Sequence, residues 1–165
     1  MRLEPFGTQH LDALREFIGD PEVLRFTRIP EPTPPDFPET WLARYEAARR
    51  EGTREAFAAI GDDGELLGLG LVPTLDHELS EAELGYIVAP AHRGRGVGAA
   101  ILRELTAWTF AQGIQRCELF IDVRNTASEG VARRAGYTHE GTLRSVHHKQ
   151  GKRVDVTVWS RLPSD

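Results

Sequence analysis

Residues 83–98 read Glu-Leu-Gly-Tyr-Ile-Val-Ala-Pro-Ala-His-Arg-Gly-Arg-Gly-Val-Gly, and this stretch says most about the fold. A short apolar strand ends at Pro90, and a loop with three glycines and two arginines follows it. An amphipathic helix begins directly behind that loop. A loop in this position presents backbone N–H groups at a helix N-terminus beside positive charge, which favours a bound phosphate or diphosphate.

The composition is that of an ordinary globular domain. The chain has 165 residues, of which 40% are hydrophobic and 27% charged, so we expect a single domain over residues 1–165. A net charge of −5 argues against general nucleic-acid binding. The longest apolar run, residues 66–72, is too short to cross a membrane. Because no signal peptide is recognisable and Cys117 is the single cysteine, we expect a cytoplasmic protein without an internal disulfide.

Hydrophobic periodicity predicts an α+β layout. Strands are expected over residues 3–6, 56–60, 66–72, 83–88, 117–123, 137–146 and 152–161. Helices are expected over residues 8–18, 38–51, 97–112 and 126–134, the last capped by Asn125. The proline-rich residues 30–38 read as an ordered surface loop. We therefore expect a mixed, mostly antiparallel central sheet flanked by about four helices.

The loop with the three glycines, residues 93–98, is called the glycine loop below. It departs from two common phosphate-binding motifs. A Walker loop needs Gly-x-x-x-x-Gly-Lys-Ser/Thr, and no Lys-Ser/Thr follows here. A dinucleotide-binding fold needs Gly-x-Gly-x-x-Gly, whereas Gly94, Gly96 and Gly98 are spaced by two and follow hairpins. A flexible turn with incidental glycines is the alternative, and it would have to explain why the glycines lie directly between a strand and a helix beside two arginines.

The motif Arg93-x-x-Gly96-x-Gly98 resembles the acetyl-CoA diphosphate loop of the GNAT superfamily of N-acetyltransferases. Residues 125–128 and 135–141 resemble the other cofactor-side motif of that superfamily, and residues 151–159 are similar to the last strand of its RimJ/RimL-like branch. That branch includes enzymes that acetylate the N-terminal amine of ribosomal proteins. The resemblance covers residues 56–162 well and the N-terminal third in layout only. It implies the GNAT (acyl-CoA N-acyltransferase) fold and direct transfer of an acetyl group to a primary amine in a ternary complex.

The resemblance also implies where acetyl-CoA, the co-substrate, is held. The amides of residues 94–99 would bind the diphosphate, with added charge from Arg93 and Arg95. The strand at Ile87 and Val88 would splay from its neighbour and leave main-chain groups for the pantetheine arm. The expected cofactor contacts are Ile87, Val88, Arg93, Gly94, Arg95, Gly96, Val97, Gly98, Ala99, Asn125 and Ser128. The scattered histidines lack metal-ligand spacing, so no metal is expected.

The group that protonates the departing thiolate is predicted to be unusual. Many GNAT enzymes carry a tyrosine seven residues beyond the asparagine, and here that position is Ala132, which cannot donate. Ser128 is the candidate instead, helped by the positive end of its helix. The alternative is that Ser128 only occupies a helical first turn, and that Asn125 only caps it.

Glu83 is the expected general base, acting through a water, because several GNAT enzymes carry a carboxylate near this position. The alternative is a solvated strand glutamate, and Asp122 and His92 are weaker candidates for the base. A peptide α-amine has a pKa near ~8, so roughly a tenth of it is already neutral at pH 7. A strong base is therefore not required.

The acceptor amine is left open by the sequence. The resemblance favours a protein N-terminus, with a small molecule (an aminoglycoside, polyamine or amino acid) as the second class. The net negative charge slightly favours cationic acceptors. A non-catalytic acyl-CoA-binding module is the alternative from another class, kept open by Ala132. Many relatives dimerise, so the resemblance implies a homodimer as one oligomeric state; no membrane or nucleic-acid partner is expected.

Overall fold

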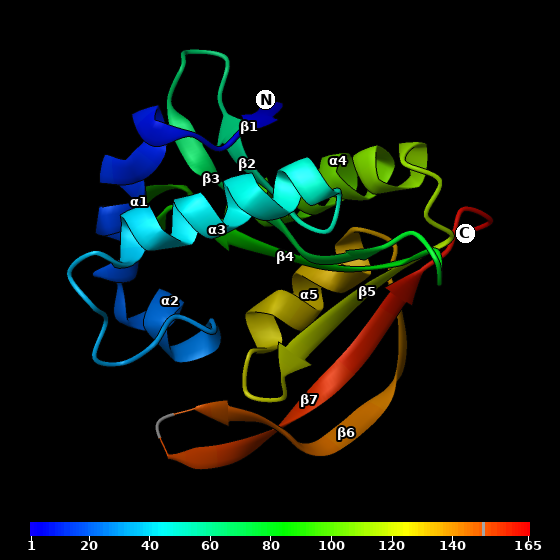
Figure 1. The fold of residues 1–165 in the computed structure, drawn as a ribbon. Helices are drawn as coiled ribbons and strands as arrows, with labels where there is room; N and C mark the ends of the chain where they lie inside the picture. The colour runs from blue at the N-terminus through cyan, green and yellow to red at the C-terminus, as the bar shows by residue number, and fades with distance from the viewer. Residues whose placement is uncertain (150) are drawn as a thin grey trace.

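The computed structural model describes residues 1–149 and 151–165, and its backbone is built around one seven-stranded sheet (Figure 1). The strand order is β1-β2-β3-β4-β5-β7-β6. The pairs are antiparallel except for β4 and β5, which run parallel. The strands are β1 (Arg2–Pro5), β2 (Glu55–Ile60), β3 (Leu66–Asp76), β4 (Glu81–Val88), β5 (Arg116–Asp122), β6 (Thr138–Lys149) and β7 (Lys152–Arg161).

Five α-helices within the described residues cover the two faces of this sheet. They are α1 (Leu11–Ile18), α2 (Pro21–Phe26), α3 (Phe37–Glu51), α4 (Val97–Ala111) and α5 (Thr126–Arg134). One face packs against α1–α3 and the other against α4 and α5. The predicted fold class, a mixed and mostly antiparallel sheet with flanking helices, is confirmed. Helix α2 was not predicted from the sequence, and the predicted loop over residues 30–38 gives way to α3 at Phe37.

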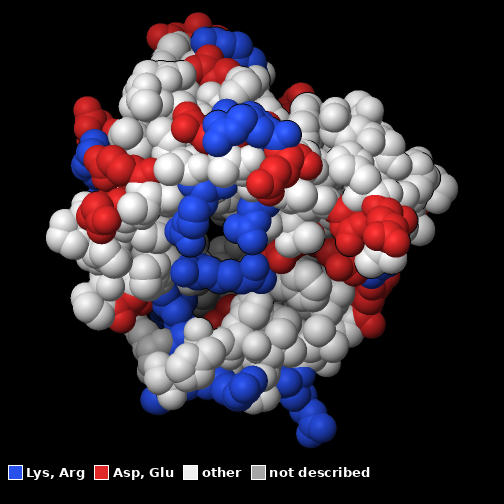
Figure 2. Space-filling model, viewed as in Figure 1, with Lys and Arg blue, Asp and Glu red and all other residues white. Residues whose placement is uncertain are grey.

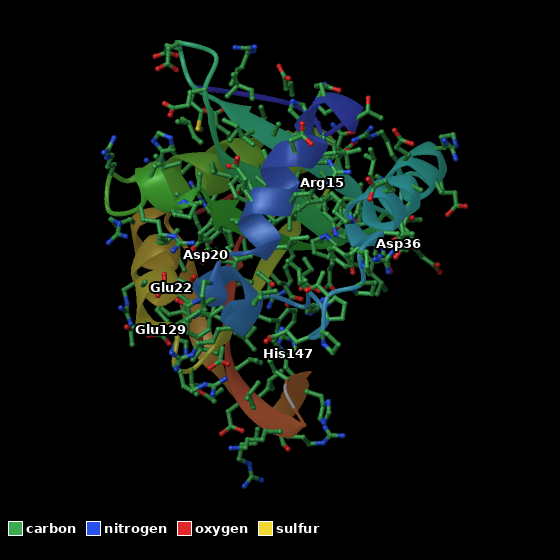
Figure 3. All side chains as sticks on the ribbon, turned by 90° about the vertical axis from the view of Figure 1, so that its left-hand side faces the viewer. Arg15, Asp20, Glu22, Asp36, Glu129 and His147 are labelled. Atoms are coloured by element: carbon green, nitrogen blue, oxygen red, sulfur yellow. The ribbon has the colours of Figure 1, made fainter. Side chains whose placement is uncertain are left out.

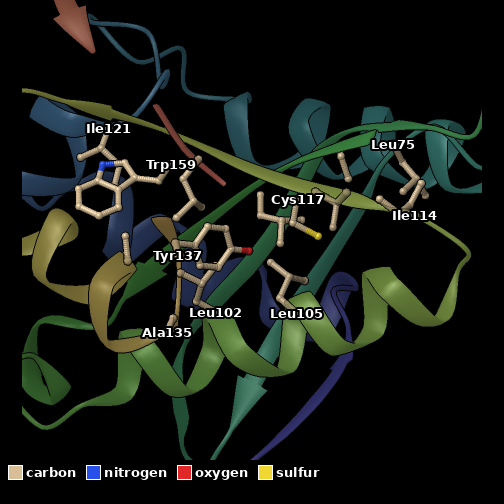
Figure 4. Packing of buried hydrophobic residues seen from close by; sticks show 14 of the residues in the cluster. Leu75, Leu102, Leu105, Ile114, Cys117, Ile121, Ala135, Tyr137 and Trp159 are labelled. Carbon is tan, nitrogen blue, oxygen red and sulfur yellow. The ribbon is translucent and has the colours of Figure 1, made fainter. Parts of the chain in front are cut away.

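Each face of the sheet has its own apolar core. Under α4, Leu102 and Leu105 are fully buried against Trp159 and Tyr137, which come from the C-terminal part of the chain (Figure 4). The second core lies under α1–α3 and includes Phe6. Burying a side chain of this size contributes roughly 1.5–3 kcal/mol each, so the two cores fix the helices on which the loops are mounted.

The feature of the sheet that matters most for function is a separation between β4 and β5. The two strands pair only from Glu81 to Glu83, which face Arg116–Glu118 of β5. Beyond Glu83, no pairing between them occurs among the described residues. The register between β3 and β4 shifts between Leu71 and Thr74, opposite the same point; such a bulge increases local twist. The splay that the resemblance implied at Ile87 and Val88 is therefore present.

The C-terminal hairpin is longer than expected. β6 continues to Lys149, three residues beyond its expected end at residue 146, whereas β7 begins at Lys152 as expected; residue 150 lies outside the described part. No helix in the described residues combines the length and apolar content needed to cross a membrane.

Candidate active site

The glycine loop joins the end of β4 to the start of α4 and leaves its amides open. Gly96 precedes the first residue of α4 and has a φ of 82°, a left-handed conformation that favours glycine. Among the described residues, no protein group accepts a hydrogen bond from the amides of residues 94–99. These N–H groups therefore form a concentrated set of free donors at the positive end of a fifteen-residue helix.

Gly98 is required for a different reason, which is close packing. A Cβ atom at this position would lie 3.0 Å from the Tyr86 ring, 3.3 Å from Val88 and 3.4 Å from Val131. The absence of a side chain thus lets the first turn of α4 approach β4 and α5 directly. This contact fixes the glycine loop against the open edge of β4.

The two arginines of the loop have different surroundings. The guanidinium of Arg93 lies 2.8 Å from Asp20 and 3.0 Å from Glu22. Figure 3 labels these two acidic residues at the start of α2. This contact is the main reason that the pKa of Asp20 falls below its ordinary value. Arg95 is exposed and makes no ion pair within the described residues. The side chain of Arg93 therefore ties α2 to the loop, whereas that of Arg95 is available to a ligand.

A pair of hydroxyl groups lies beside the separation of β4 and β5. The Tyr86 hydroxyl donates a hydrogen bond to Ser128 Oγ at 3.0 Å, and burial raises the pKa of Tyr86 to about 12. The predicted cap is confirmed: the Ser128 amide donates to Asn125 Oδ1 at 3.1 Å. Tyr86 was not predicted from the sequence, although it stands two residues after Leu84 and period two places it on the α4–α5 face of β4.

Glu83 lies on the opposite face of β4, in a small charged cluster. Its carboxylate is 2.7 Å from the guanidinium of Arg28 and is largely buried. Arg28 also lies 3.2 Å from His147 Nε2, on β6. Burial, and then repulsion by Arg28, lower the pKa of His147, so the imidazole is neutral at pH 7. Neither His147 nor Arg28 was predicted at the site, because neither residue carries a local pattern that would have placed it here.

The other titratable groups considered from the sequence have separate partners. Asp122 forms a two-point contact with Arg124, at 2.6 and 2.9 Å, and this contact lowers its pKa. His92 is buried against Glu65, 3.0 Å away. Cys117 is fully buried, and burial raises the pKa of its thiol to about 12. Within the described part of the chain, no cluster of His, Cys, Asp and Glu side chains suits a metal ion.

Comparison with known proteins agrees with this geometry. A family model described as an acetyltransferase (GNAT) domain matches residues 1–138. The L-amino acid N-acetyltransferase AaaT of Escherichia coli (strain K12) is 28% identical over 165 residues, covering 94% of this chain and 93% of its own.

Two solved structures share the fold over nearly the whole chain. RimL, the ribosomal L7/L12 α-N-protein acetyltransferase solved with coenzyme A, gives a TM-score of 0.88 at 21% identity, covering 97% of this chain and 92% of its own. Spermidine N-acetyltransferase of Vibrio cholerae, solved with coenzyme A and spermine, gives 0.86 at 18% identity, covering 99% and 95%. The family expected from the sequence is confirmed: the chain belongs to the GNAT acetyltransferases and is an acetyl-CoA-dependent N-acetyltransferase.

Proposed function

We propose that this enzyme acetylates a primary amine, with a protein N-terminus as the leading acceptor class, by direct attack within a ternary complex. The observation that carries the proposal is the set of free amides at residues 94–99, placed at the end of β4 where β5 has moved away. Small amines such as amino acids are the second acceptor class, because the AaaT relative is named for them.

The residues present fit a coenzyme A diphosphate. The amides of residues 94–99 supply donors, the start of α4 supplies a positive dipole end, and Arg95 adds a mobile charge. The edge of β4 at Ile87 and Val88, unpaired with β5, supplies main-chain groups for the pantetheine arm, and Asn125 fixes the neighbouring start of α5. Bound there, acetyl-CoA supplies a thioester, which an amine can attack without a prior acyl-enzyme.

Glu83 is proposed to receive the proton from the attacking amine, directly or through a water. Its pairing with Arg28 holds the carboxylate at a fixed place on β4. His147 is neutral at pH 7 and lies on the other side of Arg28, so the cluster holds a second proton acceptor. The demand on either group is small, because an α-amine titrates near ~8.

Ser128 is proposed to stabilise the sulfur that leaves. Because Tyr86 donates to Ser128 Oγ, the hydroxyl proton of Ser128 is free to point at another acceptor. Tyr86 itself is a poor acid, since its pKa of about 12 exceeds that of a thiol, near ~8.5. Tyr86 is thus a positioning residue, and Ser128 is the donor that faces the thiolate.

An acyl-enzyme on Cys117 is disfavoured. The thiol is fully buried in the core under α4, and a pKa of about 12 keeps it protonated. A protonated thiol is a poor nucleophile. Direct attack by the amine is the mechanism that this arrangement supports.

Thiol release from acetyl-CoA in the presence of peptide amines tests the proposal. Ser128→Ala should lower kcat roughly 100-fold while the KM for acetyl-CoA stays within about twofold. Ser160→Ala, which removes a hydroxyl bonded to Glu140 on the far strand pair, is the matched control and should keep its kcat. Full activity in Ser128→Ala would remove Ser128 from the reaction. Absence of thiol release with every amine, despite tight acetyl-CoA binding, would contradict transfer itself.

A further inference from the structure

A pocket of about 540 Å³ opens beside α2, between the segment that follows β5 and the β6–β7 hairpin. Its charged lining is strongly one-sided, with four cations, Arg25, Arg124, Lys149 and Lys152, and one anion, Glu31. Figure 2 shows Lys and Arg side chains both around a hollow near the centre of the face that Figure 1 presents and along the lower part of that face, where the β6–β7 hairpin lies. The chain as a whole has a net charge of −5, so the sign of this pocket is opposite to that of the protein.

Within the described residues, two of these cations have no close ion-pair partner, and Arg25 has only a longer-range electrostatic interaction with Asp122. Arg124 is paired with Asp122, and Lys149 lies 3.0 Å from Glu31. Arg25 stacks over the Phe26 ring at 4.9 Å. Across residues 1–149 and 151–165, neither Arg25 nor Lys152 forms an ion pair with a carboxylate. The pocket therefore offers two positive charges to an incoming group.

The pocket adjoins the proposed transfer centre. Val154 in its wall is the direct cross-strand partner of His147, and such partners lie on the same face of a hairpin. His147 contacts Arg28, and Arg28 contacts Glu83. The pocket is thus connected to Glu83 through His147 and Arg28.

We infer that this pocket binds acidic side chains that follow the reacting amine, and that the acceptor is therefore the N-terminus of an acidic peptide segment. The inference rests on the proposed transfer at Glu83. The carboxylate of a free α-amino acid is attached to the same carbon as its amine, so it meets Arg28 before the pocket. A carboxylate on the second or third residue of a peptide is several bonds further from the amine and reaches past Arg28. The net charge alone favoured cationic acceptors slightly, whereas this inference predicts a preference for acidic ones. The cations of the pocket lie close to a bound peptide, so salt screens them less than it screens the charges of the rest of the protein.

Three peptides test this preference in the full chain. They share an N-terminal serine and a labelled C-terminus and carry Asp-Glu, Ala-Ala or Lys-Lys at the second and third positions. Fluorescence polarisation in the presence of coenzyme A gives Kd, and thiol release from acetyl-CoA gives kcat/KM. The acidic peptide should bind about 10-fold more tightly than the alanine peptide and about 100-fold more tightly than the lysine peptide at low salt, a gap that narrows as salt is added.

Charge reversal in the pocket supplies the decisive variants. Lys152→Glu and Arg25→Glu should each raise the Kd of the acidic peptide about 10-fold and lower the Kd of the lysine peptide. Arg50→Glu, at an exposed position near the end of α3, is the matched control and should leave both affinities unchanged. A gain of lysine-peptide binding cannot come from misfolding.

The outcomes separate the pocket from the reaction. Equal Kd values for the three peptides would overturn the inferred role of the pocket while leaving the proposed acetyl transfer intact. Preference for the acidic peptide without any thiol release would support the pocket and overturn the proposed function. If Lys152→Glu instead raised the KM for acetyl-CoA and left peptide binding unchanged, the pocket would serve a phosphate of the co-substrate and the inference would fail. Faster acetylation of free aspartate or glutamate than of the acidic peptide would also overturn it.

Discussion

The two sides of the open edge of β4 are built in different ways. The co-substrate side consists of the glycine loop, the start of α4 and the start of α5, and its geometry comes from local features such as the positive φ of Gly96 and the cap at Asn125. The proposed acceptor side consists of α2, the segment after it and the β6–β7 hairpin. Its contacts join distant residues: Arg28 meets Glu83 across 55 positions and His147 across 119. A site built from local sequence features suits a ligand that is common to a family. A site assembled from distant segments can change its residues without disturbing the glycine loop.

The largest effect is expected at the tightest contact on the co-substrate side. Gly98→Val would place new atoms against Tyr86 and Val88, because even a Cβ at this position would lie only 3.0 and 3.3 Å from them. Overpacking of this kind costs about 1–3 kcal/mol, and it displaces the free amides. Acetyl-CoA affinity measured by calorimetry should fall at least about 10-fold. An unchanged Kd in a folded Gly98→Val protein would contradict the close approach of α4 to β4.

The next effect concerns the hydroxyl pair. Tyr86→Phe removes the hydrogen bond to Ser128 and should lower kcat about 10-fold with little change in either KM. Tyr137→Phe is the matched control, because its hydroxyl bonds Thr106 inside the core; it should lower the melting temperature without a comparable loss of kcat. In the Ser128→Ala background, Tyr86→Phe should have no further effect, since the two groups act together. Additive losses would show that Tyr86 acts independently.

Substitution of the two arginines in the glycine loop tests which of them serves the co-substrate side and which serves the proposed acceptor side. Arg95→Ala should raise the KM for acetyl-CoA about threefold, because its side chain is free for a phosphate. Arg93→Ala should instead raise the acceptor KM by a similar factor, since its guanidinium holds the start of α2 through Asp20 and Glu22. Steady-state kinetics with each substrate varied in turn separates the two. A larger acetyl-CoA effect from Arg93→Ala would place that side chain on the diphosphate.

The smallest effect is a dependence of stability on pH at His147. Burial, and then Arg28, lower its pKa in the folded state, opposed by Glu83 and Asp122. The unfolded imidazole, with a pKa near ~6.5, therefore binds protons at a pH where the folded one does not. The free energy of unfolding should decrease as the pH falls below about 6.5, and His147→Gln should flatten that slope. His77→Gln, at an exposed histidine, is the control; an equal flattening there would contradict the assignment.

The backbone of the proposed co-substrate side could be predicted from the sequence because its signals are local. Three glycines between a strand and a helix, an asparagine before a helix and a period-two strand each reflect the backbone within a few residues. Tyr86 was within reach by the same reasoning, since it alternates with Leu84 on one face of β4.

The elements of the proposed acceptor side were predicted less well, for physical reasons that differ between them. α2 has six residues and buries only Val23, so it shows no apolar period, although Asp20 and Pro21 carry the usual signals of a helix start. β6 is irregular: its register against β7 shifts between Leu143 and His147, and Ser145 has a φ of 60°. Strict alternation cannot say which way His147 points beyond such a bulge.

Backbone NMR of the ¹⁵N-labelled protein during titration with coenzyme A tests most directly whether the glycine loop grips the diphosphate. We predict that the amide signals of residues 94–99 shift most strongly, with the protons moving downfield as each gains an acceptor, and that amides of β1 stay in place. Saturable binding that leaves the signals of residues 94–99 unchanged would contradict this prediction.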